Sequence, residues 1–228
     1  MKHYTGDFQG AIKDFNRAIE LDPNYRDAYY NRGTAKHHTR DFQGAIKDFN
    51  KTIELDPNYI EAYYNRGVVR HYTGDFQGAI KDFNRGIKLD PNDTGIYYSR
   101  GNVIYDLGNF SEAIKDFNKA IELNPNFKEA YNNRGNAKQS LGDFREAIKD
   151  FDKAIKLDPN FEVAYCNRGT AKMDLGDLSG AIEDFNRVIE LDPNSIDTYN
   201  YRGKAKRELG DYEGALEDFN EAIKRGRF

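Results

Sequence analysis

Apolar residues recur along this chain at helical spacing, and each cluster of them is followed by turn residues. The clearest cluster contains, at offsets of 0, 3, 4, 7, 10 and 11, the residues Phe144, Ala147, Ile148, Phe151, Ala154 and Ile155. Such offsets place side chains on one face of an α-helix, whereas a strand would alternate them between two faces. A second helical stripe over residues 130–141 precedes this cluster and ends at Gly142. The pattern therefore predicts two helices joined by a short turn.

This helix pair repeats through the sequence without insertion. The six prolines of the chain lie 34 residues apart, at Pro23, Pro57, Pro91, Pro125, Pro159 and Pro193. Residues 3–17 recur letter for letter as residues 71–85. A fixed period of this length is typical of arrays in which neighbouring helix pairs stack and share a continuous core. We therefore expect an all-α fold built as an α-solenoid.

The period predicts a single array over residues 1–228. Residues 1–25 form a partial repeat, and the repeats that follow are 26–59, 60–93, 94–127, 128–161, 162–195 and 196–228. The partial repeat keeps only Met1 to Thr5 of its first helix, so its second helix, over residues 8–21, lacks most of a partner within the repeat. The chain is then either a fragment of a longer array or has an end that pairs with another copy.

The turns carry signals of their own. Asp143 with Glu146, and Asn109 with Glu112, predict capping boxes at the starts of two second helices. Arg40 stands where the other repeats have glycine. If this position is left-handed, an arginine there costs about 1 kcal/mol.

Two glycines lie close to the boundary between repeats 60–93 and 94–127. Gly86 replaces a small packing residue, and Gly95 stands where most repeats have Asp or Glu. They predict either an ordinary close approach of two helices, which is the simpler interpretation, or a looser joint.

Three columns, each made of residues at one position of successive repeats, define the expected interior. The core column consists of Phe15, Phe49, Phe83, Phe117, Phe151, Phe185 and Phe219. An Asp precedes each Phe, and an Arg lies on the apolar stripe of each complete first helix. Because a guanidinium on an apolar stripe must find a partner or extend to water, we expect internal ion pairs rather than arginines free to capture a ligand. The expected pairs involve Arg66, Arg100, Arg134, Arg168, Asp82, Asp116 and Asp150.

The combination of Asn-Arg-Gly, Gly-Asp-Phe-x-x-Ala-Ile and Leu-Asp-Pro-Asn, repeated over essentially the whole chain, resembles the tetratricopeptide repeat (TPR) family. The consistent departure is the Arg column, where family members usually have Leu. The resemblance implies a right-handed superhelix whose concave face is lined by the first helices and whose outer face is formed by the second helices. It is specific for the fold and says little about function, because such an array is a scaffold on which sites are placed.

The resemblance also implies a peptide-binding surface on the first helices. Its Asn column is similar to the asparagine ladder of O-linked N-acetylglucosamine transferase arrays, where amides hold the main chain of an extended peptide. An amide both donates and accepts, so it can pair with any peptide backbone, and tyrosine adds flat apolar area with a polar tip. The alternative is that these asparagines only solvate the surface or cap local backbone. The candidate residues are Tyr30, Asn31, Tyr64, Asn65, Tyr98, Ser99, Asn102, Asn133, Asn136, Asn167, Thr170 and Tyr201.

Composition narrows the choice of partner. The net charge of −4 argues against nucleic acid and against an anionic membrane surface, and no apolar run approaches the roughly 20 residues that span a bilayer. Acidic residues occupy positions where carboxylate-clamp arrays carry lysine, so we expect a neutral to basic protein or peptide instead of a captured C-terminal carboxylate. These acidic residues are Asp27, Glu61, Glu129 and Asp197.

No catalytic constellation or phosphate-binding glycine motif stands outside the repeat pattern, so we expect no enzyme activity and no cofactor. His37 and His71 share one face of adjacent first helices, but no third ligand stands at a recognisable spacing, which favours solvated histidines over a metal site. The lone Cys166 excludes an internal disulfide, fits a reducing, cytoplasmic compartment, and is best interpreted as a packing or surface-lining residue.

The sequence thus predicts a protein–protein interaction scaffold that binds a peptide or protein segment in the concave groove. Two alternatives stay open. The array could assemble with itself, for example as a homo-oligomer through the exposed N-terminal repeat, or it could be a targeting module of a larger, possibly enzymatic, protein.

Overall fold

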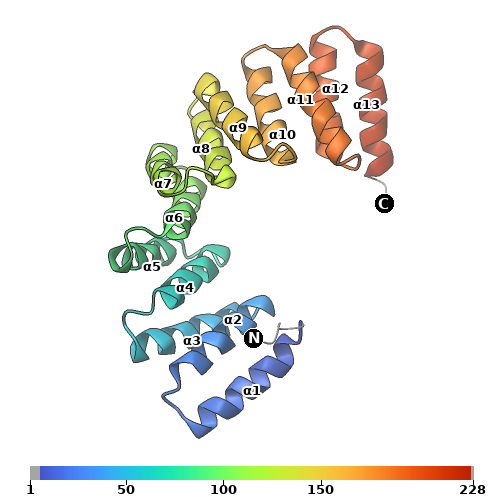
Figure 1. The fold of residues 1–228 in the computed structure, drawn as a ribbon. Helices are drawn as coiled ribbons and strands as arrows, with labels where there is room; N and C mark the ends of the chain where they lie inside the picture. The colour runs from blue at the N-terminus through green and yellow to red at the C-terminus, as the bar shows by residue number, and fades with distance from the viewer. Residues whose placement is uncertain (1–5, 227–228) are drawn as a thin grey trace. The chain divides into compact units, whose positions relative to one another are not determined.

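The computed structural model describes residues 6–226, and the regular structure within them is entirely α-helical. The chain divides into two compact units, unit 1 (Met1–Gly108) and unit 2 (Asn109–Phe228). Unit 1 contains, in chain order (Figure 1), α1 (Phe8–Leu21), α2 (Arg26–His38), α3 (Phe42–Leu55), α4 (Ile60–Tyr72), α5 (Phe76–Leu89) and α6 (Thr94–Asp106). Unit 2 contains α7 (Phe110–Leu123), α8 (Lys128–Ser140), α9 (Phe144–Leu157), α10 (Glu162–Asp174), α11 (Leu178–Leu191), α12 (Ile196–Glu208) and α13 (Tyr212–Arg225).

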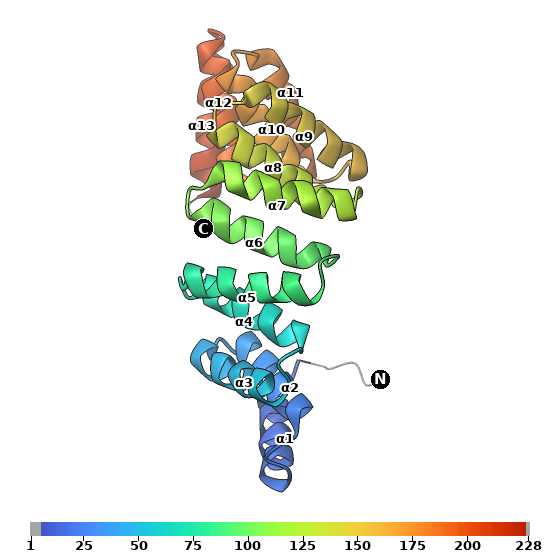
Figure 2. The same ribbon diagram turned by 90° about the vertical axis from the view of Figure 1, so that its left-hand side faces the viewer.

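Even-numbered helices are the first helices of the helix pairs and odd-numbered helices are the second helices. The first helices begin at the predicted starts of the repeats, which are Arg26, Ile60, Thr94, Lys128, Glu162 and Ile196. Consecutive helices within a unit pack against each other, so that α5, for example, contacts both α4 and α6 (Figure 2). Each helix is too short to be stable alone in water, so this lateral packing is what holds it in place.

Backbone conformation explains where the first helices end. Gly74, Gly108, Gly142, Gly176 and Gly210, each of which follows a first helix, have φ between 78° and 88°. Arg40 occupies the same position after α2 and has φ of 62°, which confirms that this position is left-handed. Because a Cβ atom is disfavoured there, α2 ends in the most strained of these turns.

Phenylalanine forms the core of each repeat. Phe49 and Phe83 in unit 1 and Phe151 and Phe185 in unit 2 are at most 1% exposed. Each ring packs on the backbone of a first helix at a glycine. A Cβ atom built on Gly67 would lie 2.8 Å from Cε1 of Phe83, so glycine is required for this close approach.

The Arg and Asp columns form ion pairs between the first and second helices. Arg66 of α4 donates from Nε and Nη2 to the two oxygens of Asp82 on α5, at 2.9 and 2.5 Å, and from Nη1 to Asn50 Oδ1 on α3 at 2.6 Å. The same fork occurs in unit 2, where Arg134 of α8 binds Asp150 on α9 and Asn118 on α7. Each of these arginines therefore ties its first helix to the second helices on both sides of it.

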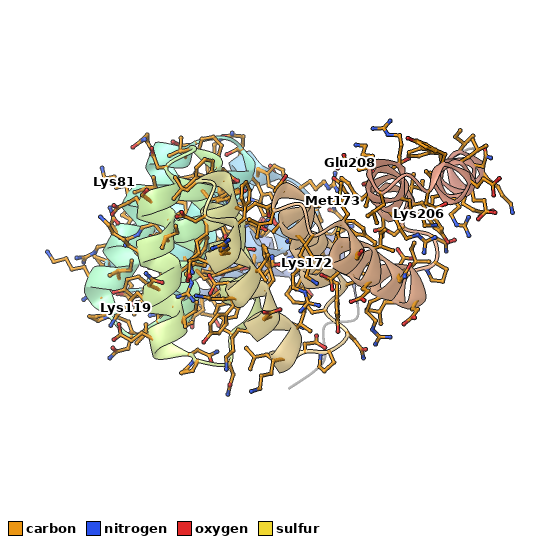
Figure 3. The ribbon with its side chains drawn as sticks, turned by 90° about the horizontal axis from the view of Figure 1, so that it is seen from above. Lys81, Lys119, Lys172, Met173, Lys206 and Glu208 are labelled. Carbon is orange, nitrogen blue, oxygen red and sulfur yellow. The ribbon has the colours of Figure 1, made fainter. Side chains whose placement is uncertain are left out.

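A second cation contacts several of the buried aspartates. Arg70 Nη1 lies 2.7 Å from Asp82, and Lys138 Nζ lies 2.7 Å from Asp150. Lys172 and Lys206, labelled in Figure 3, contact Asp184 and Asp218 in the same way. These aspartates are no more than 5% exposed, and a carboxylate buried this deeply is stable only when it is paired and hydrogen-bonded.

The predicted capping boxes are wrong. Neither Asn109 nor Asp143 makes a side-chain hydrogen bond to the helix that follows it. The two partner residues bind lysines of their own helices instead, Glu112 with Lys115 and Glu146 with Lys149.

Side-chain caps form on the second helices that have glycine three residues after the capping aspartate. Asp41, for example, accepts a hydrogen bond from the backbone N–H of Gly44 at 2.9 Å. A Cβ atom on Gly44 would collide with Oδ2 of Asp41, so a larger residue at this position requires the carboxylate to shift from the place it occupies here.

Gly86 allows the close approach of two helices, as the simpler interpretation predicts. Gly86 of α5 is buried, and a Cβ atom there would lie 2.8 Å from Cδ1 of Ile96 on α6. Ile96 is itself fully buried and stands where most other repeats have alanine. The missing side chain on one helix is thus balanced by a larger side chain on the other.

Candidate functional site

The candidate binding residues lie on one side of each unit. In unit 1, α2 contacts α4 and α4 contacts α6, and in unit 2, α8 contacts α10 and α10 contacts α12. Among the described residues of each unit, neighbouring second helices make no such contacts. The first helices therefore form the inner side of each unit, and the second helices form the outer side.

In unit 1 this inner side is built from tyrosines that reach back to the core. The ring of Tyr30 lies 6.0 Å from the ring of Phe49 and 5.0 Å from that of Tyr59. Its hydroxyl oxygen accepts a hydrogen bond from Asn65 Nδ2 of the next first helix at 2.9 Å. Burial, together with the nearby charge of Glu61, raises the pKa of Tyr30, so the hydroxyl stays neutral.

The same contact is repeated one step further along unit 1. Ser99 Oγ of α6 donates to the hydroxyl of Tyr64 on α4 at 3.3 Å. Tyr64 also packs on Phe83, with 6.0 Å between ring centroids. Each tyrosine therefore joins a core ring to the polar group of the following repeat, and is half-buried instead of lying flat on the surface.

In unit 2 the contact between the first helices α8 and α10 is made by amides instead of a tyrosine. Asn167 Nδ2 of α10 donates to Asn132 Oδ1 of α8 at 2.9 Å, and Asn132 Nδ2 donates to Asn133 Oδ1 at 3.1 Å. Asn132, which stands in the Tyr column, is only 3% exposed. Asn133 and Asn167 are half-buried, so part of each amide faces outward.

Sequence reasoning missed Gln139, which joins the same two helices. Its Nε2 donates to Thr170 Oγ1 at 3.3 Å and to Asp174 Oδ2 at 3.0 Å. Gln139 stands in the column of His37 and His71, and the polar residues of that column were the available signal.

The other candidates are placed differently from one another. Asn31 is exposed and makes no side-chain hydrogen bond within residues 6–226, whereas Tyr98, Asn102 and Asn136 are half-buried on α6 and α8. Tyr201 stacks on Phe185 at 5.9 Å and carries Lys204 Nζ above its ring at 5.6 Å.

This arrangement leaves part of the side chains of Asn65 and Asn167 available. An asparagine amide can donate two hydrogen bonds, and its oxygen can accept two. Asn65 and Asn167 each use one N–H on a neighbouring helix. That bond fixes the orientation of the amide and leaves a second N–H and the carbonyl oxygen, which together match one peptide group.

Cations on the first helices partly neutralise the acidic residues near this surface. Arg26 binds Asp27 at 2.6 Å, and Lys128 lies 3.8 Å from Glu129. Glu61 and Asp197 are exposed and have no ion-pair partner among the described residues. The two carboxylates without a cation among the described residues therefore lie on α4 in unit 1 and on α12 in unit 2.

The side chains of His37 and His71 contact residues of their own or the next repeat. His71 Nε2 lies 2.6 Å from Asp106 Oδ2, and His37 packs on Phe42 and Tyr72 with ring centroids 6.0 and 5.9 Å apart. Burial, and secondarily the charge of His38, lowers the pKa of His37. Over residues 6–226 no group of three or more His, Cys, Asp or Glu side chains could hold a metal ion.

Cys166, the only cysteine of the chain, has a thiol that is partly protected from solvent. Cys166 is half-buried on α10, and burial raises its pKa, which disfavours the reactive thiolate. None of the helices described here is both long enough and apolar enough to cross a membrane.

Sequence comparison matches most of the chain to one family. Residues 27–59, 60–93, 129–161 and 163–195 match the family described as "Tetratricopeptide repeat". Residues 1–38 and 101–142 match "TPR repeat", and residues 185–217 match a further "Tetratricopeptide repeat" family. A search of curated proteins finds no match.

Solved structures of several repeat proteins are similar. The crystal structure of MamA shares 28% identity over 70% of this chain and 94% of its own, with a TM-score of 0.66. YrrB, described as a TPR protein with an unusual peptide-binding site, is 24% identical over 82% of this chain and 96% of its own, with a TM-score of 0.66. A tetratricopeptide repeat protein from Parabacteroides merdae ATCC 43184 is 23% identical over 97% of this chain and 88% of its own, with a TM-score of 0.77.

Proposed function

Because the chain belongs to the tetratricopeptide repeat family, whose members generally serve as non-enzymatic protein-interaction scaffolds, we propose that its first helices bind an extended peptide segment of a protein partner. The segment lies along the inner side of a unit, and its backbone pairs with the outward parts of the asparagine amides. The residues that carry this role are Asn65 in unit 1 and Asn133 and Asn167 in unit 2, with Tyr30, Tyr64 and Thr170 beside them.

The observation that carries the proposal is the hydrogen bond from Asn65 Nδ2 to Tyr30 Oη, together with its counterpart from Asn167 to Asn132. A surface asparagine that only solvates the protein needs no fixed orientation. Here a neighbouring helix holds each amide, so less conformational entropy is lost when the amide pairs with a peptide group.

The charges of the same surface favour a neutral to basic segment. The exposed carboxylates of Glu61 and Asp197 have no ion-pair partner among the described residues, so a lysine or arginine of the ligand can approach them. Such exposed pairs contribute more to orientation and association rate than to affinity.

A pull-down from the native source, followed by calorimetry with the captured peptide, tests the proposal. Replacing Asn65, Asn133 and Asn167 with Ala should weaken binding at least about tenfold, since each lost pair of hydrogen bonds contributes about 1 kcal/mol or more. Helicity should be unchanged, because these amides are only half-buried.

Asn220→Ala is the matched control. Asn220 is exposed on the second helix α13, away from the first helices, and its replacement should leave binding at the wild-type level. Undiminished binding by the triple variant would refute the role of the amides.

A further inference from the structure

The face of α1 that corresponds to the buried face of the other second helices is open. No residue of α1 is buried. Asp14 is exposed and has no cation partner within residues 6–226, whereas its equivalent Asp48 is 3% exposed and bound by Arg32 and Lys36. Phe15 is half-buried, whereas its equivalent Phe49 is fully buried.

The sequence of α1 indicates which kind of helix this face binds. Residues 8–17 of α1 are identical to residues 76–85 of α5, and α5 binds the first helix α4. In that contact the guanidinium of Arg66 donates to both carboxylate oxygens of Asp82, and Gly67 lies against the ring of Phe83. The open face of α1 thus presents the same side chains that α5 uses to hold α4.

Besides Asp14 and Phe15, this face has a third contact point, which is a pocket of about 280 Å³. It is lined by Phe8, Ala11 and Phe15 of α1 and by Asn31, Thr34 and His38 of α2. One repeat later, Tyr30 packs on the equivalent cluster around Phe49 and accepts the hydrogen bond of Asn65.

The pocket is therefore a place for a tyrosine side chain. Asn31, the equivalent of Asn65, is the donor that would bind its hydroxyl. In the register of α4 this tyrosine is Tyr64, two residues before Arg66.

We propose that the open face of α1 is a docking site for a helix of a partner polypeptide that carries the sequence Tyr-x-Arg-Gly. The tyrosine fills the pocket beside Asn31. The guanidinium of the arginine donates two hydrogen bonds to the carboxylate of Asp14, and the glycine lies against Phe15. This site shares Asn31 of α2 with the inner side of unit 1, but it uses none of the asparagines that carry the proposed function, and neither proposal depends on the other.

The choice of occupant rests on complementarity of both charge and shape. The equivalent of Asp14 in α5 is Asp82, which binds two cations, so this face favours a basic helix. The equivalent of Phe15 is Phe83, whose ring lies against a glycine, so a helix with a larger residue at that position does not fit. In α4 the segment 60–68 contains Tyr64, Arg66 and Gly67, which make the equivalent contacts, so this segment is the pattern for the occupant.

The test is fluorescence anisotropy of the whole chain with a labelled, helix-stabilised peptide that has the sequence of residues 57–68. The wild-type chain should bind it, and Asp14→Arg should weaken binding about tenfold or more, because a charge-assisted fork is lost. The exposed position of Asp14 makes this variant safe for folding, which circular dichroism checks.

A charge swap separates the proposed contact from general electrostatics. A peptide with Arg66→Asp should bind the Asp14→Arg chain better than it binds wild type. The control variant Glu183→Arg makes the same change in net charge at an exposed position of α11 and should bind like wild type. A peptide with Tyr64→Ala should also bind more weakly, since it leaves the pocket empty.

Three results would overturn the proposal. They are no binding of the unmodified peptide, equal binding by wild type and Asp14→Arg, and failure of the charge swap to restore affinity. Concentration-dependent self-association of the chain alone that Asp14→Arg abolishes would assign the face to a second copy, and would likewise overturn the choice of a separate partner.

Discussion

Unit 1 and unit 2 share one internal framework but present different inner surfaces. Apart from Asp14, Phe15 and Phe219, both bury the Phe column and the Asp column, with arginine forks that tie three helices together. On the first helices, the column that holds tyrosine in unit 1 holds smaller polar residues in unit 2. Its members in chain order are Tyr30, Tyr64, Tyr98, Asn132, Cys166 and Asn200. The framework tolerates little change because every repeat must pack on the next, whereas the inner surface can vary.

The units also solve one packing problem in two ways. Where α5 meets α6 in unit 1, Gly86 faces the fully buried Ile96. At the same positions in unit 2, α7 and α8 have Ala120 and Ala130, both fully buried. In unit 1 one large side chain fills the space between the two helices, whereas in unit 2 two small side chains share it.

The largest expected effect tests whether the two units share a core. Phe83→Ala in unit 1 and Phe151→Ala in unit 2 should each lower the free energy of unfolding by about 3–5 kcal/mol, because both rings are almost completely buried. Guanidinium titration followed by circular dichroism measures the loss, and hydrogen exchange assigns it to a unit. A loss at one position less than half of that at the other would contradict the shared framework.

An intermediate effect tests the unequal packing in unit 1. Ile96→Ala should cost about 2–5 kcal/mol, because it leaves a cavity opposite Gly86. Gly86→Ala alone should be close to neutral or cost up to about 2 kcal/mol, since crowding against Ile96 offsets the gain in helix propensity.

The double variant recreates the Ala–Ala pair of unit 2. It should lose less stability than the sum of the single changes, with a coupling of about 1 kcal/mol or more in a double-mutant cycle. Simple additivity would show that the two residues do not compensate each other.

The smallest effect concerns the helix caps. Asp41→Ala in unit 1 removes the hydrogen bond to the N–H of Gly44 and should cost about 1 kcal/mol. Asp143→Ala in unit 2 removes no side-chain cap and should change stability by less than about 0.5 kcal/mol. Thermal unfolding of the two variants side by side measures the difference, and equal losses would restore a capping role for Asp143.

Features that depend on spacing could be predicted from the sequence. The offsets of Phe144, Ala147 and Phe151 place them on one helix face whatever the neighbours do, and α9 carries them so. Arg40 is left-handed, as its position in the glycine column predicts. The pairing of Arg66 with Asp82 follows from two charged columns that would otherwise be buried alone.

Features that depend on competition between partners could not be predicted. Glu146 has the spacing of a capping box, but it binds Lys149 instead. The tyrosines of unit 1 were predicted as a flat platform, yet Tyr30 is held between Phe49 and Asn65. Each outcome depends on a second group whose distance only the folded chain sets.

The sequence by itself determined the helix pairs, their turns and the buried column, because a 34-residue period imposes the same neighbours on every repeat. The tertiary structure alone decided which group each asparagine of the inner side binds. Asn65 and Asn167 occupy the same column, but one donates to a tyrosine and the other to an amide. Hydrogen bonds need atoms within about 3 Å of each other, and that distance depends on which side chain the adjacent repeat supplies.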